Sequence, residues 1–203
     1  GSTTAITDKK VRVPRLQKKM NISVAKDAAF NFMYQENLEI LHQLGQVTFF
    51  SPLKDHSFPV ADLLYLPGGY PELYAEELAA NNGMKTSILA FCENGGKVIA
   101  ECGGMMYLGK ELLDKEGKNY SMVNFLDIET SMQHAKLSLG YRKILIDQLA
   151  LTGHEFHYST CSEKSTIASI GEVFNAKGMK VNSPIYQQKN VIASYIHFYW
   201  GEN

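Results

Sequence analysis

Short apolar runs alternate with amphipathic stretches through the first half of the chain. The runs at residues 21–25, 46–50, 63–66 and 97–100 have the length and residue types of buried strands. Between them, the stretch from Phe30 to Leu44 has the apolar spacing of a helix and ends at Gly45, and residues 73–94 also have a helical pattern. Apolar strands that alternate with helices are typical of a parallel sheet covered on both faces. We therefore expect an α/β fold, flavodoxin-like in outline, with a mostly parallel sheet and helices on both faces.

The pattern changes in the second half of the chain. From Tyr120 to Ser159, short alternating segments with turns predict some added antiparallel strands at one side of the sheet. The run from Val191 to Ile196 then returns as a short buried strand and delivers His197 at its carboxyl end. Ligands of open α/β sheets bind at that edge, so we expect His197 to lie where chemistry takes place.

Cys102 follows a predicted strand that ends at Glu101, and it precedes Gly103, Gly104 and a predicted helix. A strand, a tight turn with small residues and a helix together expose a strained nucleophile in many hydrolases. The amino end of the following helix favours a thiolate, so we expect a lowered pKa for the Cys102 thiol. An inert buried cysteine is the competing interpretation.

A cysteine nucleophile needs a general base, and His197 is the candidate that the chain offers. A second strand ends in the tight turn Pro67-Gly68-Gly69. The backbone N–H of Gly69, beside that of Gly103, is placed to hold the oxyanion of a tetrahedral intermediate. On the opposite interpretation, His197 is a satisfied core histidine and the glycine pair is only a turn.

Composition sets the class of protein without identifying it. The chain has 203 residues, is 45% hydrophobic and carries a formal charge of −1, which fits one catalytic domain and gives no reason to expect a nucleic-acid partner. It contains no apolar run of membrane-spanning length and no secretory signal, and its three cysteines fit a reducing compartment, so we expect a cytoplasmic enzyme. The spacing of these cysteines gives no metal signature.

Residues 1–20 differ from the rest of the chain. The chain opens with Gly1-Ser2, which looks like the remnant of an expression tag, and six basic residues lie between Lys9 and Lys19. We expect residues 1–20 to be a tag remnant and a solvated linker, and residues 21–203 to be the catalytic domain.

Four strings carry a family resemblance. In chain order they are LPGGYPEL at 66–73, AECGGMMYL at 100–108, GHEFHYS at 153–159 and ASYIH at 193–197. Their order and spacing resemble the glutaminase half of the cobyrinic acid a,c-diamide synthases, which are type I glutamine amidotransferases of the cobyric acid synthase branch. Shorter strings at 24–30, 36–39, 49–53 and 139–142 extend the resemblance over nearly all of residues 21–199.

The resemblance implies an activity and roles for four residues. L-glutamine is hydrolysed to glutamate and ammonia, and an ATP-dependent synthetase domain uses the ammonia to amidate the a- and c-acetate side chains of cobyrinic acid, a tetrapyrrole, in cobalamin biosynthesis. Cys102 is then the nucleophile, His197 the general base and acid, and Gly69 and Gly103 the oxyanion hole. Many members of the wider class carry a glutamate two residues after the histidine. Here that position is Tyr199, so a Cys-His pair is expected, with the group that orients His197 unidentified.

The resemblance leaves out the nucleotide-binding half of these synthases. That half contains a phosphate-binding loop, whereas this chain has no Gly-x-x-x-x-Gly-Lys-Ser/Thr run. We expect an excised C-terminal domain whose partner is an N-terminal synthetase domain, or else a synthetase on a separate polypeptide. On either interpretation ATP and Mg belong to the missing synthetase, and this domain uses no cofactor.

Three polar residues are further candidates. On the predicted strand Gly153 to Ser159, alternation places His154 and Phe156 on one face and Glu155 and His157 on the other. The resemblance makes Glu155 and His157 candidates for the glutaminase pocket or for the domain interface at which the tetrapyrrole sits, with structural hydrogen bonding as the alternative. Arg142 is a candidate for a two-pronged contact with a carboxylate of glutamine or of the tetrapyrrole, or it is an ordinary surface arginine.

Other functions remain open at this stage. A similar glutaminase can serve another acceptor, such as sirohydrochlorin or a cell-wall lipid intermediate. Cysteine hydrolases with the same elbow, including chaperone-like and peptidase relatives, do not usually carry the Tyr-Pro-Glu and His-Glu-Phe-His strings. A third possibility is an inactive glutaminase-like domain retained for docking.

Overall fold

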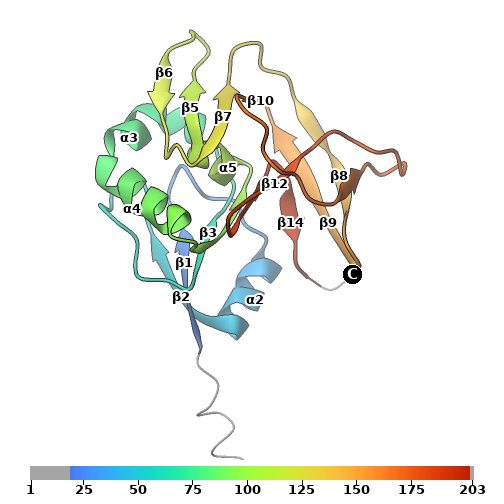
Figure 1. Cartoon of the computed structure of the whole chain (residues 1–203), viewed down its shortest axis with the longest axis horizontal. Helices are drawn as coiled ribbons and strands as arrows, with labels where there is room; N and C mark the ends of the chain where they lie inside the picture. The colour runs from blue at the N-terminus through green and yellow to red at the C-terminus, as the bar shows by residue number, and fades with distance from the viewer. Residues whose placement is uncertain (1–18, 202–203) are drawn as a thin grey trace, which may run out of the picture.

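The computed structural model describes residues 19–201, so the tag and linker predicted for residues 1–20 lie almost wholly outside the described residues. Its central sheet has six strands in the order β12-β13-β4-β3-β1-β2 (Figure 1). Five are parallel to their neighbours, and β12 is an antiparallel edge. The strands are β1 (Met20–Ala25), β2 (Gly45–Phe50), β3 (Leu63–Leu66), β4 (Lys97–Glu101), β12 (Ile185–Gln188) and β13 (Val191–Ser194). The flavodoxin-like order confirms the predicted fold class.

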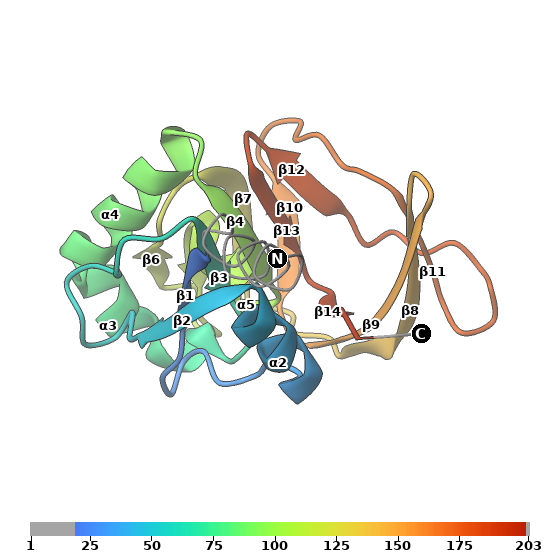
Figure 2. The ribbon, with the colours of Figure 1, turned by 90° about the horizontal axis from the view of Figure 1, so that it is seen from below.

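Helices cover both faces of this sheet (Figures 1 and 2). On one face, Leu41 of α2 (Gln35–Leu44) packs with Val24 and Tyr65. On the other face, α3 (Ala75–Ala80), α4 (Asn82–Glu93) and α5 (Gly103–Leu108) pack on apolar residues such as Leu64 and Ala100. Successive strand residues thus point to opposite cores, which explains why the strands have almost continuous apolar sequences.

One predicted helix boundary is wrong. The helix expected from Phe30 begins at Gln35, because the backbone of Phe32 exchanges two hydrogen bonds of 3.1 Å with Gly68 in the turn after β3. The stretch 73–94 is divided into the 3-10 helix η1 (Pro71–Tyr74), α3 and α4. The break lies at Asn81, whose side chain accepts a hydrogen bond from the Met84 N–H at 3.2 Å, as expected of an amide that caps a helix.

Two smaller sheets complete the fold. One contains β5 (Gly109–Leu113), β6 (Asn119–Ser121), β7 (Leu126–Ser131) and β10 (Thr160–Glu163), and the other is antiparallel and contains β8 (Ser138–Ile146), β9 (Leu149–His157), β11 (Glu172–Phe174) and β14 (His197–Tyr199). Figure 1 shows β8, β9 and β14 on the side of the molecule opposite α3 and α4. The added antiparallel strands are therefore confirmed.

His197 does not end the strand in which it was predicted. Strand β13 stops at Ser194, whose hydroxyl accepts a hydrogen bond of 3.1 Å from the Ile196 N–H in a turn. After this turn His197 opens β14, which pairs with β9 of the antiparallel sheet. The chain therefore changes sheets just before His197.

Helix α5 lies close against β3 at Gly104. A Cβ atom at this position would lie 2.1 Å from the carbonyl oxygen of Leu66. We expect Gly104→Ala to lower the free energy of unfolding by about 3 kcal/mol, because the backbone on both sides must move. Gly178→Ala is the control, since Gly178 has a φ of +80° but no atom within 4 Å, and its expected loss is about 1 kcal/mol. Urea unfolding measures both losses, and equal losses would contradict the close approach.

Candidate active site

Cys102 occupies the turn between β4 and α5 in a strained conformation. Its φ of 48° and ψ of −105° are unusual for a residue with a side chain. The Cys102 N–H donates a hydrogen bond of 2.7 Å to the Ser194 carbonyl at the end of β13, which helps to hold the turn. The sulfur lies 3.8 Å from the Phe156 carbonyl oxygen of β9. The strained turn expected of a nucleophile is thus present.

The lowered thiol pKa predicted for Cys102 is wrong. Burial raises the pKa of the Cys102 thiol well above its ordinary value, and the carboxylates of Glu72, Glu155 and Glu101 act in the same direction. A hydrogen bond from the Gly103 N–H only partly offsets them. The sequence shows the amino end of the helix that follows Cys102, which on its own would lower the thiol pKa. In the structure that helix, α5, is only six residues long, and three acidic side chains raise the thiol pKa instead. The resting residue is a thiol, so a base must remove its proton during the attack.

The two glycine turns predicted to form an oxyanion hole lie against each other. A Cβ atom placed on Gly103 would lie 3.2 Å from the backbone nitrogen of Gly69 and 3.0 Å from its carbonyl oxygen. The turn after β3 therefore meets the turn after β4 beside Cys102. The backbone nitrogens of Gly69 and Gly103 thus belong to turns that lie against each other, as an oxyanion hole built from two strands requires.

His197 lies over the first of these turns. A Cβ atom on Gly68 would lie 2.2 Å from the Cε1 atom of His197, so only a glycine leaves room for the imidazole. The edge of the Phe32 ring packs against the imidazole, with 4.6 Å between the ring centroids. Since Gly68 adjoins Gly69, the imidazole and the candidate oxyanion hole share one turn.

The electrostatics of His197 keep its imidazole neutral. Burial lowers its pKa to about 3, and the neighbouring His154 and His157 act in the same direction. Its Nδ1 atom is buried and has no hydrogen-bond partner among residues 19–201. The imidazole is thus neutral near pH 7 and is oriented by ring packing, not by a carboxylate. Tyr199, two residues after His197, packs against Tyr34 with 5.3 Å between ring centroids.

His154 is a site residue that the sequence analysis did not select. It pairs with His197 across β9 and β14, and the two imidazoles stack with 5.3 Å between centroids. Its Nδ1 atom forms a close contact with the hydroxyl of Tyr34. Alternation placed His154 on the face shared with Phe156, as observed. The pairing of β9 with β14 that brings His197 to the same face joins segments far apart in the chain, so the sequence did not indicate it.

An open cavity of about 380 Å³ lies in front of His197. Its lining comes from the loop before α2, the turn after β3, and strands β9 and β14; the residues are Asn31, Phe32, Gly69, Tyr70, His154, Phe156 and His197. The volume is within the range of small-molecule sites, and the candidate base lies in the wall. The cavity is therefore the candidate substrate site.

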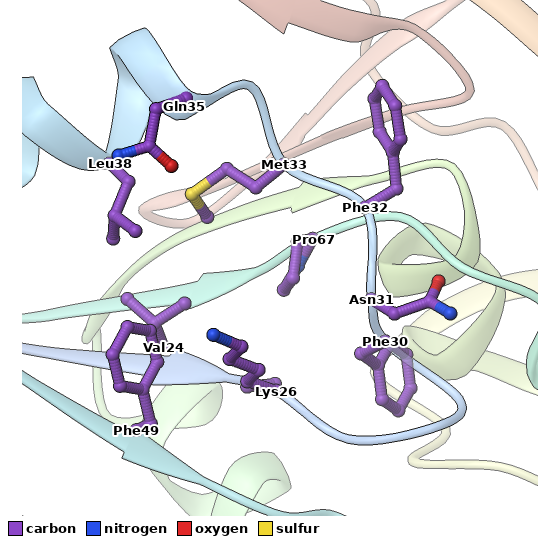
Figure 3. Close-up of a pocket in the computed structure, with 11 residues that line it drawn as sticks. Val24, Lys26, Phe30, Asn31, Phe32, Met33, Gln35, Leu38, Phe49 and Pro67 are labelled. Atoms are coloured by element: carbon purple, nitrogen blue, oxygen red, sulfur yellow. The ribbon is translucent and has the colours of Figure 1, made fainter.

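A second cavity of about 140 Å³ lies nearby, between β1, β2 and the loop before α2 (Figure 3). The Lys26 ammonium lies 4.9 Å from the centroid of the Phe49 ring in its wall. Figure 3 shows the ring of Phe32 turned away from Lys26. The loop at residues 31–33 therefore separates the two cavities, and the Phe32 ring packs on the side of His197.

Arg142, Glu155 and His157 lie on the other face of β9, as the alternation predicted for the last two. The Arg142 Nε and His157 Nε2 atoms bind the Glu155 carboxylate at 2.9 and 2.8 Å. Burial opposes ionisation of Glu155, but hydrogen bonds from His157, Ser183 and Arg142 together lower its pKa to about 2. Glu155 and His157 line a separate cavity of about 270 Å³. Arg142 thus holds a carboxylate of its own chain through one nitrogen, and none of the three lines the cavity at His197.

Within residues 19–201, no group of three or more His, Cys, Asp or Glu side chains could hold a metal ion. The helices of this part of the chain are also too short or too polar to cross a membrane.

Comparisons with known proteins agree on the class of the domain. The family model of the CobB/CobQ-like glutamine amidotransferase domain matches residues 21–203. A hydrogenobyrinate a,c-diamide synthase of Stutzerimonas stutzeri is 40% identical over 181 residues, which are 89% of this chain and 42% of that protein. A cobyrinate a,c-diamide synthase of Clostridium acetobutylicum is 39% identical over 196 residues, 92% of this chain and 44% of that protein. The chain thus spans less than half the length of these relatives, and it matches their C-terminal part.

Solved structures support the fold. PurLQS from Thermotoga maritima has a TM-score of 0.56 at 13% identity, with 89% of this chain and 88% of that chain covered. A glutamine amidotransferase from the same organism has a TM-score of 0.58 at 11% identity, with 89% and 76% covered. At such low identity the likeness concerns the fold alone.

Proposed function

The chain belongs to the CobB/CobQ-like glutamine amidotransferase family, and on this premise we propose that it hydrolyses L-glutamine to glutamate and ammonia through Cys102 and His197. One observation supports these roles above the others. The turns that carry Cys102 and the glycine pair meet at Gly103 and Gly69, and the neutral imidazole of His197 lies over the same glycine pair.

The first half of the proposed reaction forms a thioester. His197 takes the proton from the Cys102 thiol as the sulfur bonds to the amide carbon of the glutamine side chain. The carbonyl oxygen becomes an oxyanion that accepts hydrogen bonds from the Gly69 and Gly103 N–H groups. The imidazolium of His197 then gives its proton to the leaving nitrogen, the carbon–nitrogen bond breaks, and ammonia departs.

The second half of the reaction returns the enzyme to its starting state. The neutral His197 takes a proton from water as the water oxygen bonds to the thioester carbon. The carbon–sulfur bond then breaks, the Cys102 sulfur regains its proton from His197, and glutamate leaves. The resting imidazole of His197 is neutral near pH 7 and so has a lone pair with which to accept a proton in each half, although a pKa of about 3 makes it a weak base.

The same proposal extends to the acceptor of the ammonia. The relatives named above are hydrogenobyrinate and cobyrinate a,c-diamide synthases. By that similarity the ammonia passes to an ATP-dependent synthetase domain outside this chain, where ATP and Mg serve the amidation of the a- and c-acetates of a cobyrinic acid-type tetrapyrrole.

The proposed role of His197 sets the acid limb of the pH profile. A base must be neutral to act, and a pKa of about 3 keeps His197 neutral well below the ordinary histidine range. We therefore expect kcat/KM for glutamine hydrolysis to stay constant as the pH falls from about 7 to about 5. Initial rates of glutamate formation at low glutamine concentration measure this. A decline with a midpoint near the ordinary pKa of about 6.5 would show that burial does not control the base.

The experiment that tests the function uses a protein that carries both the glutaminase and the synthetase. Glutamate release is measured with and without ATP and cobyrinic acid. Release that rises with both substrates supports the proposed acceptor class. If glutamate release does not depend on cobyrinic acid, the glutaminase activity is supported, and the acceptor is then sirohydrochlorin or a cell-wall lipid intermediate. No release under any condition would favour an inactive domain retained for docking.

A further inference from the structure

The face of the antiparallel sheet that carries His197 continues beyond the substrate cavity. Tyr141 of β8 pairs with His154 of β9, and His154 pairs with His197 of β14. Leu139 pairs in the same way with Phe156, which lines the cavity. Because directly paired residues point to the same face of a sheet, Leu139 and Tyr141 lie on the face of the candidate base.

Beside the cavity, the exposed part of this face is apolar, and the exposed Lys143 lies further along β8. Leu139 is 60% exposed and Tyr141 is 48% exposed on one side of the cavity, while Phe32 and Tyr70 are 38% and 39% exposed in its lining. We call these four residues the apolar rim. An outward face of an antiparallel sheet is usually polar, and apolar residues gathered around a polar site mark a place where another surface binds.

The reverse face of the same strands shows the contrast. Ile144 of β8, Leu151 of β9 and Phe198 of β14 are buried there and form a core of their own. The sheet therefore has the apolar face it needs for folding, and the exposed residues of the apolar rim add nothing to that core. Figures 1 and 2 place β8 at the outer side of the molecule, away from α3 and α4.

We propose that the apolar rim is the docking surface of the ATP-dependent synthetase domain, which closes over the cavity at His197. This inference rests on the proposed function. More than half the length of the curated relatives lies outside the part that this chain matches, so those relatives have enough polypeptide to supply such a domain. Aromatic side chains, which make up three of the four residues of the apolar rim, are enriched at the centre of interfaces, where water is excluded.

The chemistry gives a reason for docking at this point. Ammonia that escapes into water near pH 7 takes up a proton, and the resulting ammonium ion has no lone pair with which to attack an activated acetate. A domain seated on the rim of the cavity receives ammonia before it reaches the solvent. Docking on this surface thus couples release of the nitrogen at Cys102 to its use.

The test compares coupling in a protein that carries both domains. We expect the double variant Leu139→Ser, Tyr141→Ser to lower glutamine-dependent amidation at least 10-fold, with ammonia-dependent amidation unchanged and more glutamate released per amide formed. Val60→Asp is the control, because Val60 is 91% exposed but precedes β3 and so lies away from the carboxyl ends of the strands. It is expected to keep the coupling of the unmodified protein.

A second measurement does not depend on activity. Hydroxyl-radical footprinting is expected to show Leu139 and Tyr141 protected in the two-domain protein and reactive in this chain alone. The docking surface is wrong if Leu139 and Tyr141 are equally protected in the two-domain protein and in this chain alone. It is also wrong if the double variant uses glutamine for amidation as well as the unmodified protein does. Protection in this chain alone, together with a dimer in sedimentation that the double variant loses, would assign the apolar rim to a second copy and overturn the proposal. If Leu139 and Tyr141 are protected in the two-domain protein but the unmodified protein releases no glutamate, the docking surface is supported and the proposed function is rejected.

Discussion

Replacing Cys102 by alanine is expected to reduce glutamate release from glutamine by roughly 10⁴-fold or more, because no other group can form the thioester. Cys92 and Cys161 cannot substitute for it. Cys92 is buried in α4, and Cys161 lies on β10 in the wall of the separate cavity of Glu155 and His157. The measurement is glutamate formation under single-turnover and steady-state conditions.

The control for this loss is Cys161→Ser, which changes a partly buried thiol away from the cavity at His197 and is expected to keep the full rate. In a protein that also carries the synthetase, Cys102→Ala should still form the amide from added ammonia. If ammonia-dependent amidation is lost together with the glutaminase, Cys102 has a structural role instead.

The second large effect is expected at Glu101, which lies next to the nucleophile. Its Oε2 atom accepts hydrogen bonds from the Tyr65 hydroxyl at 2.7 Å and from the Phe198 N–H at 3.1 Å. The indole of Trp200 donates to the same Tyr65 hydroxyl at 3.1 Å. Because Glu101 precedes Cys102 and Phe198 follows His197, this carboxyl joins the strand of the nucleophile to the strand of the base.

Glu101→Ala removes the acceptor of two buried donors. We expect it to lower the free energy of unfolding by about 3 kcal/mol and to reduce kcat more than it raises KM, because β14 and His197 lose a positioning contact. Urea unfolding and steady-state kinetics measure the two effects. Glu101→Gln keeps an acceptor oxygen and is expected to retain most of the activity, so equal damage by both substitutions would contradict a positioning role.

The same residue makes stability depend on pH. Burial raises the pKa of Glu101 from 4.5 to about 8, so between these values the folded protein holds a proton that the unfolded chain releases. The contribution of this group is therefore fully present at low pH and is lost as the pH rises toward 8, by up to about 1.4 kcal/mol per pH unit. Below about pH 6.5 the lowered pKa of His197 acts in the opposite direction in both proteins. Urea unfolding at several pH values should therefore show this fall in the difference between the free energies of unfolding of the unmodified chain and Glu101→Gln. Parallel profiles would show that Glu101 titrates normally.

The fold class, the order of most strands along the chain and the two turns that carry the candidate site residues were predicted from the amino-acid sequence. These features depend on local rules, such as the alternation of apolar strands with helices, or the need for small residues around a strained turn at Cys102. Alternation within β9 also separated His154 and Phe156 from Glu155 and His157 without any knowledge of the partner strands. Motif strings at fixed spacing then connected these local features to one family.

Other properties arise from contacts between segments that are distant in the chain, and these could be read only from the folded molecule. His197 lies in the antiparallel sheet because the chain turns after Ser194, and it stacks on His154 because β14 pairs with β9. The Cys102 thiol keeps its proton because folding buries it and brings Glu72 near it, whereas the sequence showed only the helix that follows. A pKa depends on burial and on charges in space, and these are known only when all the segments are in place.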